Sequence, residues 1–282
     1  MDGRYAPSPT GPLHLGNLRT ALVAWLFARA DGSRFLVRIE DLDSGRVRPE
    51  HEAGQLADLH LIGLDWDGEP VRQSERGALY AAALERLDTY PCFCTRAEIR
   101  EAASAPHGAL PEGSYPGICR DLPAAQRAER EAAGRPPALR VRVPEGAGID
   151  DFVVRRNDGA FAYNLAVVVD DADQGIEQVV RGADLEETTP RQQWLAGALG
   201  VGSPVFTHVP LVLGPDGNRL AKRHGAVTLA DRPEHPDEVR GMLAASLGLA
   251  APGTAPALDE LLARFREGGA EALPQDPWVF DQ

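Results

Sequence analysis

The sequence predicts an α/β fold, in which strands and helices alternate along a chain of 282 residues. A short strand at residues 3–5 leads through a stiff turn into a helix that starts at residues 14–17. A second strand covers residues 35–41. The alternation is interrupted at residues 91–120 by a segment that contains all three cysteines. We therefore expect an α/β body that carries a small cysteine-containing insertion.

The composition is that of a globular protein, with 43% apolar residues and a net charge of −13. This charge disfavours general affinity for nucleic acid, so any RNA contact must be a local basic face. No apolar run reaches the ~18 residues that span a bilayer. Three cysteines, an odd number, argue against a disulfide framework and for the cytoplasm.

The turn at residues 4–17 has the sequence RYAPSPTGPLHLGN. Its three prolines exclude helix, and helical spacing of apolar residues begins directly afterwards. A helix N-terminus offers free N–H groups that suit phosphate, and Gly16 leaves room for a phosphate to approach. His14 can donate a hydrogen bond to a phosphoryl oxygen, and Asn17 can cap the helix. For His-x-Gly alone, an ordinary surface histidine is the alternative.

The second strand, residues 35–41, ends in acidic residues. Ligands of open α/β sheets bind at the carboxyl ends of the strands, which places Glu40 to meet an ammonium group. An acid in a solvated loop is the alternative. Helices are expected next at residues 49–62 and 75–88.

The segment at residues 91–120 contains Cys92-x-Cys94 and Tyr115-x-x-x-Cys119. Three thiols that converge on one point indicate a tetrahedral zinc site. The fourth ligand is either His107 or Tyr115, and free thiols without metal remain an alternative. Because the segment is too small for a core of its own, a zinc ion here would be structural.

The later elements have local signals of their own. Helices are expected at residues 122–133, from 189, at 236–247 and at 258–266, strands at 139–143, 152–156 and 178–181, a hairpin turn at 158–159, and a frayed tail at the end. The segment 161–171, headed by Tyr163, becomes almost wholly apolar and suits a buried pocket wall. Arg181 has the forked guanidinium that suits a carboxylate, with a surface ion pair as the alternative.

Residues 212–225 combine a turn with a basic cluster that holds Lys222, the single lysine beside 28 arginines. Lysine is a compact point charge and arginine a wide planar fork, so a lone lysine suggests a place where arginine would not serve. A surface lysine kept by chance is the alternative.

Residues 4–17 resemble the first signature of the class I aminoacyl-tRNA synthetases, in the form of the glutamyl and glutaminyl branch: Arg-x-Ala-Pro-Ser-Pro-Thr-Gly-x-Leu-His-x-Gly. Residues 219–223 resemble the second signature, the Lys-Met-Ser-Lys-Ser loop. The resemblance implies a Rossmann-type catalytic domain that binds ATP with Mg²⁺. By resemblance, the residues at the ATP site are His14, Gly16, Asn17 and Lys222, with His14 and Lys222 catalytic.

The sequence departs from both signatures. Asn17 stands where many members of the class carry a second histidine, so a proton-donating role of an imidazole there cannot be carried over. In the second signature, Arg219, Ala221 and Arg223 replace the first lysine and the two serines, whereas Lys222 keeps the second lysine.

The resemblance also implies a glutamate pocket and the zinc ligands. The residues that would bind L-glutamate are Arg4, Ala6, Ser8, Glu40, Tyr163 and Arg181, with the two arginines on the two carboxylates. The shorter glutamyl-synthetase paralogues have Cys-x-Cys and then Tyr-x-x-x-Cys. This pattern favours Tyr115 over His107 and gives the zinc ligands Cys92, Cys94, Tyr115 and Cys119.

Only 59 residues follow Arg223, too few for the anticodon-binding portion of a full glutamyl-tRNA synthetase. The chain thus resembles the truncated paralogues, which activate glutamate without tRNA and esterify it to the queuosine wobble base of tRNA-Asp. The resemblance implies a cytoplasmic monomer that binds the queuosine-containing anticodon stem-loop. The alternatives are a minimal glutamyl-tRNA synthetase that charges the 3′ end of tRNA, an adenylyltransferase of small cofactors, and an inactive nucleotide-binding paralogue.

Four parts of the chain are expected. They are the first half of the catalytic domain at residues 1–90, the zinc-binding insertion at 91–120, the second half of the catalytic domain at 121–230, and a short helical C-terminal extension without an anticodon-binding domain at 231–282.

Overall fold

The structure is a computed structural model that describes residues 1–103 and 114–281, with Ala103 and Lys222 described by their backbone only. The chain forms two compact units. Unit 1 comprises Met1–Glu75, Gly175–Glu187 and Pro204–Gln282, and unit 2 comprises Arg76–Gln174 and Thr188–Ser203. Each unit is therefore assembled from segments that are distant in the sequence.

Unit 1 is built on a five-stranded parallel sheet. Across the sheet the strands are β3 (Val71–Arg72), β2 (Phe35–Ile39), β1 (Gly3–Tyr5), β7 (Gln178–Gly182) and β8 (Val205–Val209). From β1 the strands run to β2 on one side and to β7 on the other, so the topological switch point lies at β1. The predicted α/β fold with a Rossmann-type sheet is confirmed.

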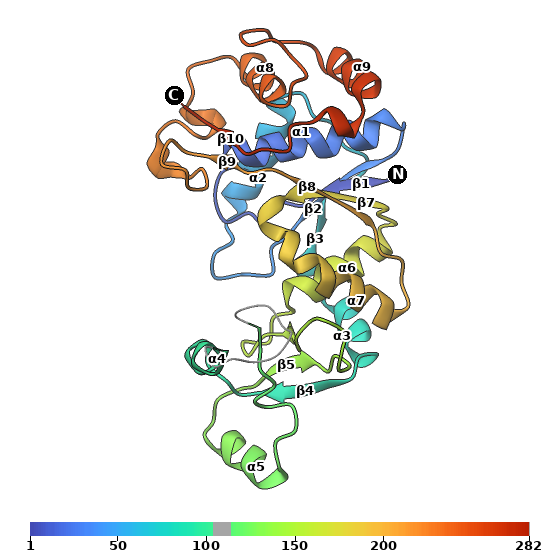
Figure 1. Cartoon of the computed structure of the whole chain (residues 1–282), viewed down its shortest axis with the longest axis vertical. Coiled ribbons are helices and arrows are strands. Elements are labelled where there is room, and N and C mark those ends of the chain that lie inside the picture. Colours follow the sequence, from blue (N-terminus) through green and yellow to red (C-terminus); the bar gives the residue numbers. More distant parts are fainter. Residues whose placement is uncertain (104–113, 282) are drawn as a thin grey trace. The chain divides into compact units, whose positions relative to one another are not determined.

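Unit 1 contains α-helices in addition to the sheet. They are α1 (Leu15–Ala30), α2 (Pro49–Leu61), α8 (Pro236–Ser246) and α9 (Leu258–Gly268). Helix α1 is buried on most sides because it packs against β1 and β7 and also against α8 and α9 (Figure 1). The two C-terminal helices therefore share the core of unit 1. No helix within residues 1–103 and 114–281 is long and apolar enough to cross a bilayer.

The prediction of a frayed tail at the end of the chain is wrong, because a strand lies there. Trp278–Val279 form strand β10, which pairs in parallel with β9 (Val212–Leu213). Phe280 is 2% exposed, and its N–H donates to the Leu213 carbonyl at 2.8 Å. The guanidinium of Arg232 lies 5.3 Å from the centre of the Phe280 ring. A strand of two residues has no periodicity, so its sequence does not reveal it.

Unit 2 contains a three-stranded antiparallel sheet and short helices. The strands are β4 (Thr89–Cys92), β5 (Ala138–Val141) and β6 (Val153–Arg155), and the helices are α3 (Gly77–Glu85), α4 (Arg96–Ala103), α5 (Ala124–Ala132), α6 (Tyr163–Asp173) and α7 (Thr189–Leu199). The predicted buried segment is helix α6, in which residues 165–171 are all buried. Helix α4 has no counterpart among the predicted elements.

Candidate active site and cysteine cluster

The turn between β1 and α1 is held by hydrogen bonds from neighbouring segments. Gln55 of α2 is 2% exposed, and its side-chain amide donates to the carbonyls of Ser8 at 3.1 Å and Gly11 at 2.7 Å. The Pro7 carbonyl accepts from the N–H of Glu40 at 2.9 Å. The turn is thus fixed to α2 and to the end of β2, in addition to the stiffness that its prolines give. A single glutamine in a helix carries no sequence signal, so Gln55 was not predicted.

His14 is the N-cap of α1, and Asn17 is its partner at the third helical position. The backbone N–H of Asn17 donates to His14 Nδ1 at 3.3 Å, and Asn17 Oδ1 accepts from the N–H of His14 at 3.1 Å. An Nδ1 that accepts carries no proton, so the neutral ring holds its proton on Nε2. Burial, and then the charge of Arg219, lower the pKa of His14 to about 4. At pH 7 the ring is neutral and can donate one hydrogen bond from Nε2.

Gly16 gives the imidazole its space. A Cβ atom at this position would lie 3.0 Å from Cε1 and Nδ1 of His14 and 3.4 Å from Cβ of Val212. Contacts of 3.0 Å are tighter than nine in ten that a real Cβ makes, so a side chain here would shift the ring by a few tenths of an ångström. Gly16 therefore leaves His14 in its observed position, and the approach of a phosphate at this glycine stays a prediction.

The two signature motifs lie together in unit 1. The N–H of Leu15 donates to the Val227 carbonyl at 2.8 Å, and His14 forms a β-bridge with Thr228. The chain that leaves the second motif is therefore paired with the start of α1. The two motifs, some two hundred residues apart in the sequence, thus meet in one region, as the resemblance implies.

Asp184 joins the second motif to the sheet. It lies in the 3₁₀-helix Ala183–Thr188, directly after β7, and its carboxylate forms an ion pair with Arg219. Both charges act on the pKa of His14, Arg219 lowering it and Asp184 raising it. Asp184 was not singled out from the sequence, although its place at the carboxyl end of a strand was a usable signal.

We call residues 214–225 the signature loop. It follows β9 and begins with a closed turn, in which the N–H of Gly214 donates to the Asn218 carbonyl at 2.8 Å. Lys222 is the first residue of a 3₁₀-helix that ends at His224. Since the description of Lys222 covers its backbone only, the role of its side chain stays a prediction.

The residues predicted to bind glutamate are divided between the two units. In unit 1, Arg4 belongs to β1, Ala6 and Ser8 follow it, Glu40 follows β2, and Arg181 belongs to β7. Strands β1, β2 and β7 are neighbours, so these five residues lie in or shortly after three adjacent strands at the switch point. Tyr163 is the first residue of α6 in unit 2.

Two aromatic residues of β8 orient Arg181. Its guanidinium lies 4.6 Å from the centre of the Phe206 ring, and its Nε–H donates to Nε2 of His208 at 3.3 Å. Burial, and then the charge of Arg181, lower the pKa of His208, which favours the neutral, accepting ring. Arg181 is only 4% exposed, so its fork is held in one direction. The sequence did not identify Phe206 or His208, because pairing between β7 and β8 is not a local property.

The three cysteines converge in unit 2. The sulfur atoms of Cys92, Cys94 and Cys119 all lie within 4.8 Å of one another. The hydroxyl of Tyr115 lies 3.4 Å from the sulfur of Cys92. Tyr115 thus stands at the cluster as the resemblance implies, and His107 lies outside the residues that the structure describes.

Burial, and then the hydrogen bond with Cys92, raise the pKa of Tyr115, so in the absence of a metal ion its surroundings favour the neutral phenol. Its Oη accepts from the N–H of Cys119 at 2.7 Å, and the guanidinium of Arg140 lies 3.6 Å from the ring centre. Hydrogen bonds from Cys119 and then Cys94 lower the pKa of the Cys92 thiol. Three sulfurs and one oxygen make a four-ligand donor set that fits tetrahedral zinc.

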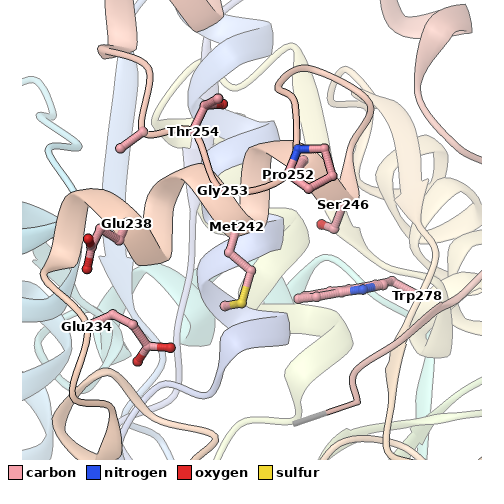
Figure 2. Close-up of a pocket in the computed structure, with 10 residues that line it drawn as sticks. Glu234, Glu238, Met242, Ser246, Pro252, Gly253, Thr254 and Trp278 are labelled. Atoms are coloured by element: carbon pink, nitrogen blue, oxygen red, sulfur yellow. The ribbon is translucent and has the colours of Figure 1, made fainter.

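Unit 1 also contains a hollow of about 620 Å³ beside α8. Figure 2 shows Met242 and Trp278 at its floor, with the carboxylates of Glu234 and Glu238 at one end. Both carboxylates already have partners, since Glu234 pairs with Arg232 and Glu238 accepts from a backbone N–H. Among the described residues, those that line this hollow belong to neither signature.

Residues 1–251 match the family model of the class I tRNA synthetases (E and Q), catalytic domain. A glutamyl-Q tRNA(Asp) synthetase of Nocardia farcinica is 57% identical, over 98% of this chain and 92% of the relative. One of Symbiobacterium thermophilum is 50% identical, over 88% of this chain and 87% of the relative. The chain belongs to the class I tRNA synthetases of the E and Q type and, within them, to the family of the glutamyl-Q tRNA(Asp) synthetases.

Two solved structures agree with the assignment to the class I tRNA synthetases of the E and Q type. A glutamate tRNA ligase from Elizabethkingia meningosepticum, in complex with its amino acid, matches with a TM-score of 0.81 and 27% identity. The match covers 100% of this chain and 67% of that structure. A glutamate-tRNA synthetase from Elizabethkingia anophelis matches with the same TM-score and 28% identity.

Proposed function

We propose that this chain activates L-glutamate with ATP, without tRNA, and then transfers the glutamate to the queuosine wobble base of tRNA-Asp. The observation that carries this proposal is the shared name of its relatives, glutamyl-Q tRNA(Asp) synthetase, at 57% and 50% identity. The position of both signatures around His14 in unit 1 supports it. The enzyme is thus a ligase that forms an ester at the expense of ATP.

In the activation step, an oxygen of the glutamate α-carboxylate attacks the α-phosphorus of ATP, and the bond to pyrophosphate breaks. His14 donates its Nε2 proton in a hydrogen bond to an α-phosphoryl oxygen, whose negative charge grows in the transition state. Lys222 offsets the charge of the leaving pyrophosphate, and Asn17 and Gly16 border the nucleotide. The Mg²⁺ that accompanies ATP adds positive charge at the phosphates.

Glutamate is recognised by its three charges. Arg4 and Arg181 bind the two carboxylates, because each guanidinium can form two parallel charge-assisted hydrogen bonds. Glu40 binds the ammonium group at the end of β2, and Ala6 and Ser8 line the path from β1. Tyr163, the first residue of α6, is the remaining residue that the resemblance assigns to glutamate. The aromatic support of Arg181 favours this role, since it holds the fork in one direction.

In the transfer step, a hydroxyl of the queuosine cyclopentenediol attacks the mixed anhydride and releases AMP. No side chain is assigned as general base, and the AMP phosphate can accept the proton. The net charge of −13 disfavours extensive binding of RNA, so we propose that the protein binds only the anticodon stem-loop. By the family resemblance, we propose that it acts as a monomer in the cytoplasm. A zinc ion held by Cys92, Cys94, Tyr115 and Cys119 stabilises unit 2.

The test is transfer of labelled glutamate in the presence of ATP. The acceptors are a queuosine-containing anticodon stem-loop of tRNA-Asp, the same stem-loop with unmodified guanosine, and tRNA-Glu. We expect label on the first acceptor alone, and glutamate-dependent ATP–pyrophosphate exchange without any RNA. Label at the 3′ end of tRNA-Glu would instead identify a minimal glutamyl-tRNA synthetase. Absence of both exchange and transfer would identify an inactive nucleotide-binding paralogue.

A further inference from the structure

The side chain of His224 spans the signature loop from its last turn to its first residue. It is 7% exposed although the residues around the turn are exposed. The backbone N–H of Ala221 donates to His224 Nδ1 at 3.0 Å. The face of the ring lies against Gly214, where a Cβ atom would be only 2.7 Å from Cε1 and Nδ1. The imidazole therefore connects two points of the loop that are far apart along the chain.

A third contact reaches the tip of the turn. Nε2 of His224 lies 3.1 Å from Oδ1 of Asp216. Since Nδ1 accepts from Ala221, the neutral ring carries its proton on Nε2, which faces the carboxylate. Asp216 also accepts from the backbone N–H of Asn218 at 2.9 Å. One imidazole thus lies within contact distance of the start, the tip and the end of the loop, and at the end it accepts a hydrogen bond from Ala221.

These contacts bear on Lys222 through the backbone. The side chain of His224 accepts from the N–H of Ala221, the residue directly before Lys222. The backbone N–H of His224 in turn donates to the Ala221 carbonyl at 2.9 Å. Both polar groups of Ala221 are therefore bound to His224. These two hydrogen bonds therefore help to set the backbone direction at Lys222, from which its side chain extends.

We propose that His224 is a positioning residue of the activation step, which holds the backbone from which Lys222 reaches the leaving pyrophosphate. The proposal rests on the proposed function. His224 touches neither substrate in it. The hydrogen bond from the N–H of Ala221 to Nδ1 depends on Gly214, because a side chain at position 214 would displace the ring that accepts this bond.

Three substitutions separate this role from a general contribution to stability. In His224→Asn, the side-chain oxygen takes the place of Nδ1 and keeps the acceptor for Ala221. In His224→Gln, the amide nitrogen takes the place of Nε2 and the Nδ1 acceptor is lost. His224→Ala removes both. We expect the Ala and Gln variants to lose about ten- to a hundredfold in the kcat of glutamate-dependent pyrophosphate exchange, as for a displaced catalytic group.

The Asn variant should stay within about threefold of the parent, since a retained hydrogen bond keeps most of the geometry. KM for glutamate should not change in any of them, because Arg4 and Arg181 are untouched. The matched control is His235→Ala. His235 also accepts a backbone N–H at Nδ1, at 3.4 Å, but it is exposed and caps α8. Its loss should leave exchange unchanged.

A double substitution tests the contact with Gly214. Gly214→Ala alone should lower exchange as His224→Ala does, because the new methyl group displaces the ring. In the His224→Ala background the same change should cost nothing further, so the two effects should not add. Additive losses, a Gln variant as active as the parent, or losses that follow the melting temperature across all variants would overturn the proposal.

Failure of the proposed function is distinguishable from failure of this inference. If the parent protein shows no glutamate-dependent exchange, the function is wrong. If the parent is active and the Asn variant is as impaired as the Ala variant, the function stands and the role of His224 is refuted. Transfer of glutamate from preformed glutamyl-adenylate should be unaffected in every variant, because pyrophosphate has already left.

Discussion

Because the pKa of His14 is lowered in the folded state, unit 1 should lose unfolding free energy as the pH falls from 7 to 5, by an amount that can be calculated. Its pKa is lowered from 6.5 to about 4, first by burial and then by the charge of Arg219. Between pH 7 and pH 5 the unfolded chain takes up a proton on this histidine and the folded chain does not, so stability falls as the pH falls. The difference amounts to about 2 kcal/mol of unfolding free energy lost by pH 5.

The measurement is denaturant unfolding of the parent and of His14→Ala at pH 7 and pH 5. The parent should lose about 2 kcal/mol more than the variant over this range, whatever the cap itself contributes at pH 7. An NMR titration should place the pKa of His14 near 4, with the proton of the neutral ring on Nε2. Equal losses in the two proteins, or a neutral ring with its proton on Nδ1, would refute the reasoning about the capping box.

The other predictions concern the metal, the lysine and the core. Protein prepared without chelators should contain about one zinc ion per chain by metal analysis, and Tyr115→Phe should release it whereas His107→Ala should not. Zinc-free protein with full activity and unchanged melting would count against the site. Lys222→Ala should lower adenylate formation about a hundredfold or more, and Lys222→Arg should not restore it; a fully active Arg form would mean that the lone lysine is accidental. Arg19 is 1% exposed and donates to Ser246 Oγ at 3.0 Å and the Pro210 carbonyl at 2.9 Å. Arg19→Ala should therefore cost about 3 kcal/mol or more of unfolding free energy, whereas exposed Arg46→Ala should change the melting temperature little.

Features that depend on neighbouring residues were predictable from the sequence. The turn before α1 follows from its prolines, the sheet from alternating apolar segments, and the cysteine cluster from the spacing of its thiols. The capping of α1 was predicted only in part. Asn17 was expected to cap the helix, whereas His14 is the cap and Asn17 binds it in return, because either side chain can accept a backbone N–H.

Features that depend on partners far along the chain were not predictable. Gln55 holds the turn from another helix, Asp184 holds Arg219 from the 3₁₀-helix after β7, and Phe206 supports Arg181 from the next strand of the sheet. Each of these residues is of a common type in an ordinary local pattern. Only the register of the folded chain, which a single sequence does not reveal, gives them their roles.

The pairing of β9 with β10 has a consequence for how this protein can be dissected. The family model ends at residue 251, whereas β10 and Phe280 lie beyond it. A fragment cut at that boundary would contain both signatures and yet would leave β9, the strand directly before Gly214, without its neighbour. During synthesis, likewise, β9 leaves the ribosome well before its partner exists. The signature loop therefore acquires its full support only after α8 and α9 have been made.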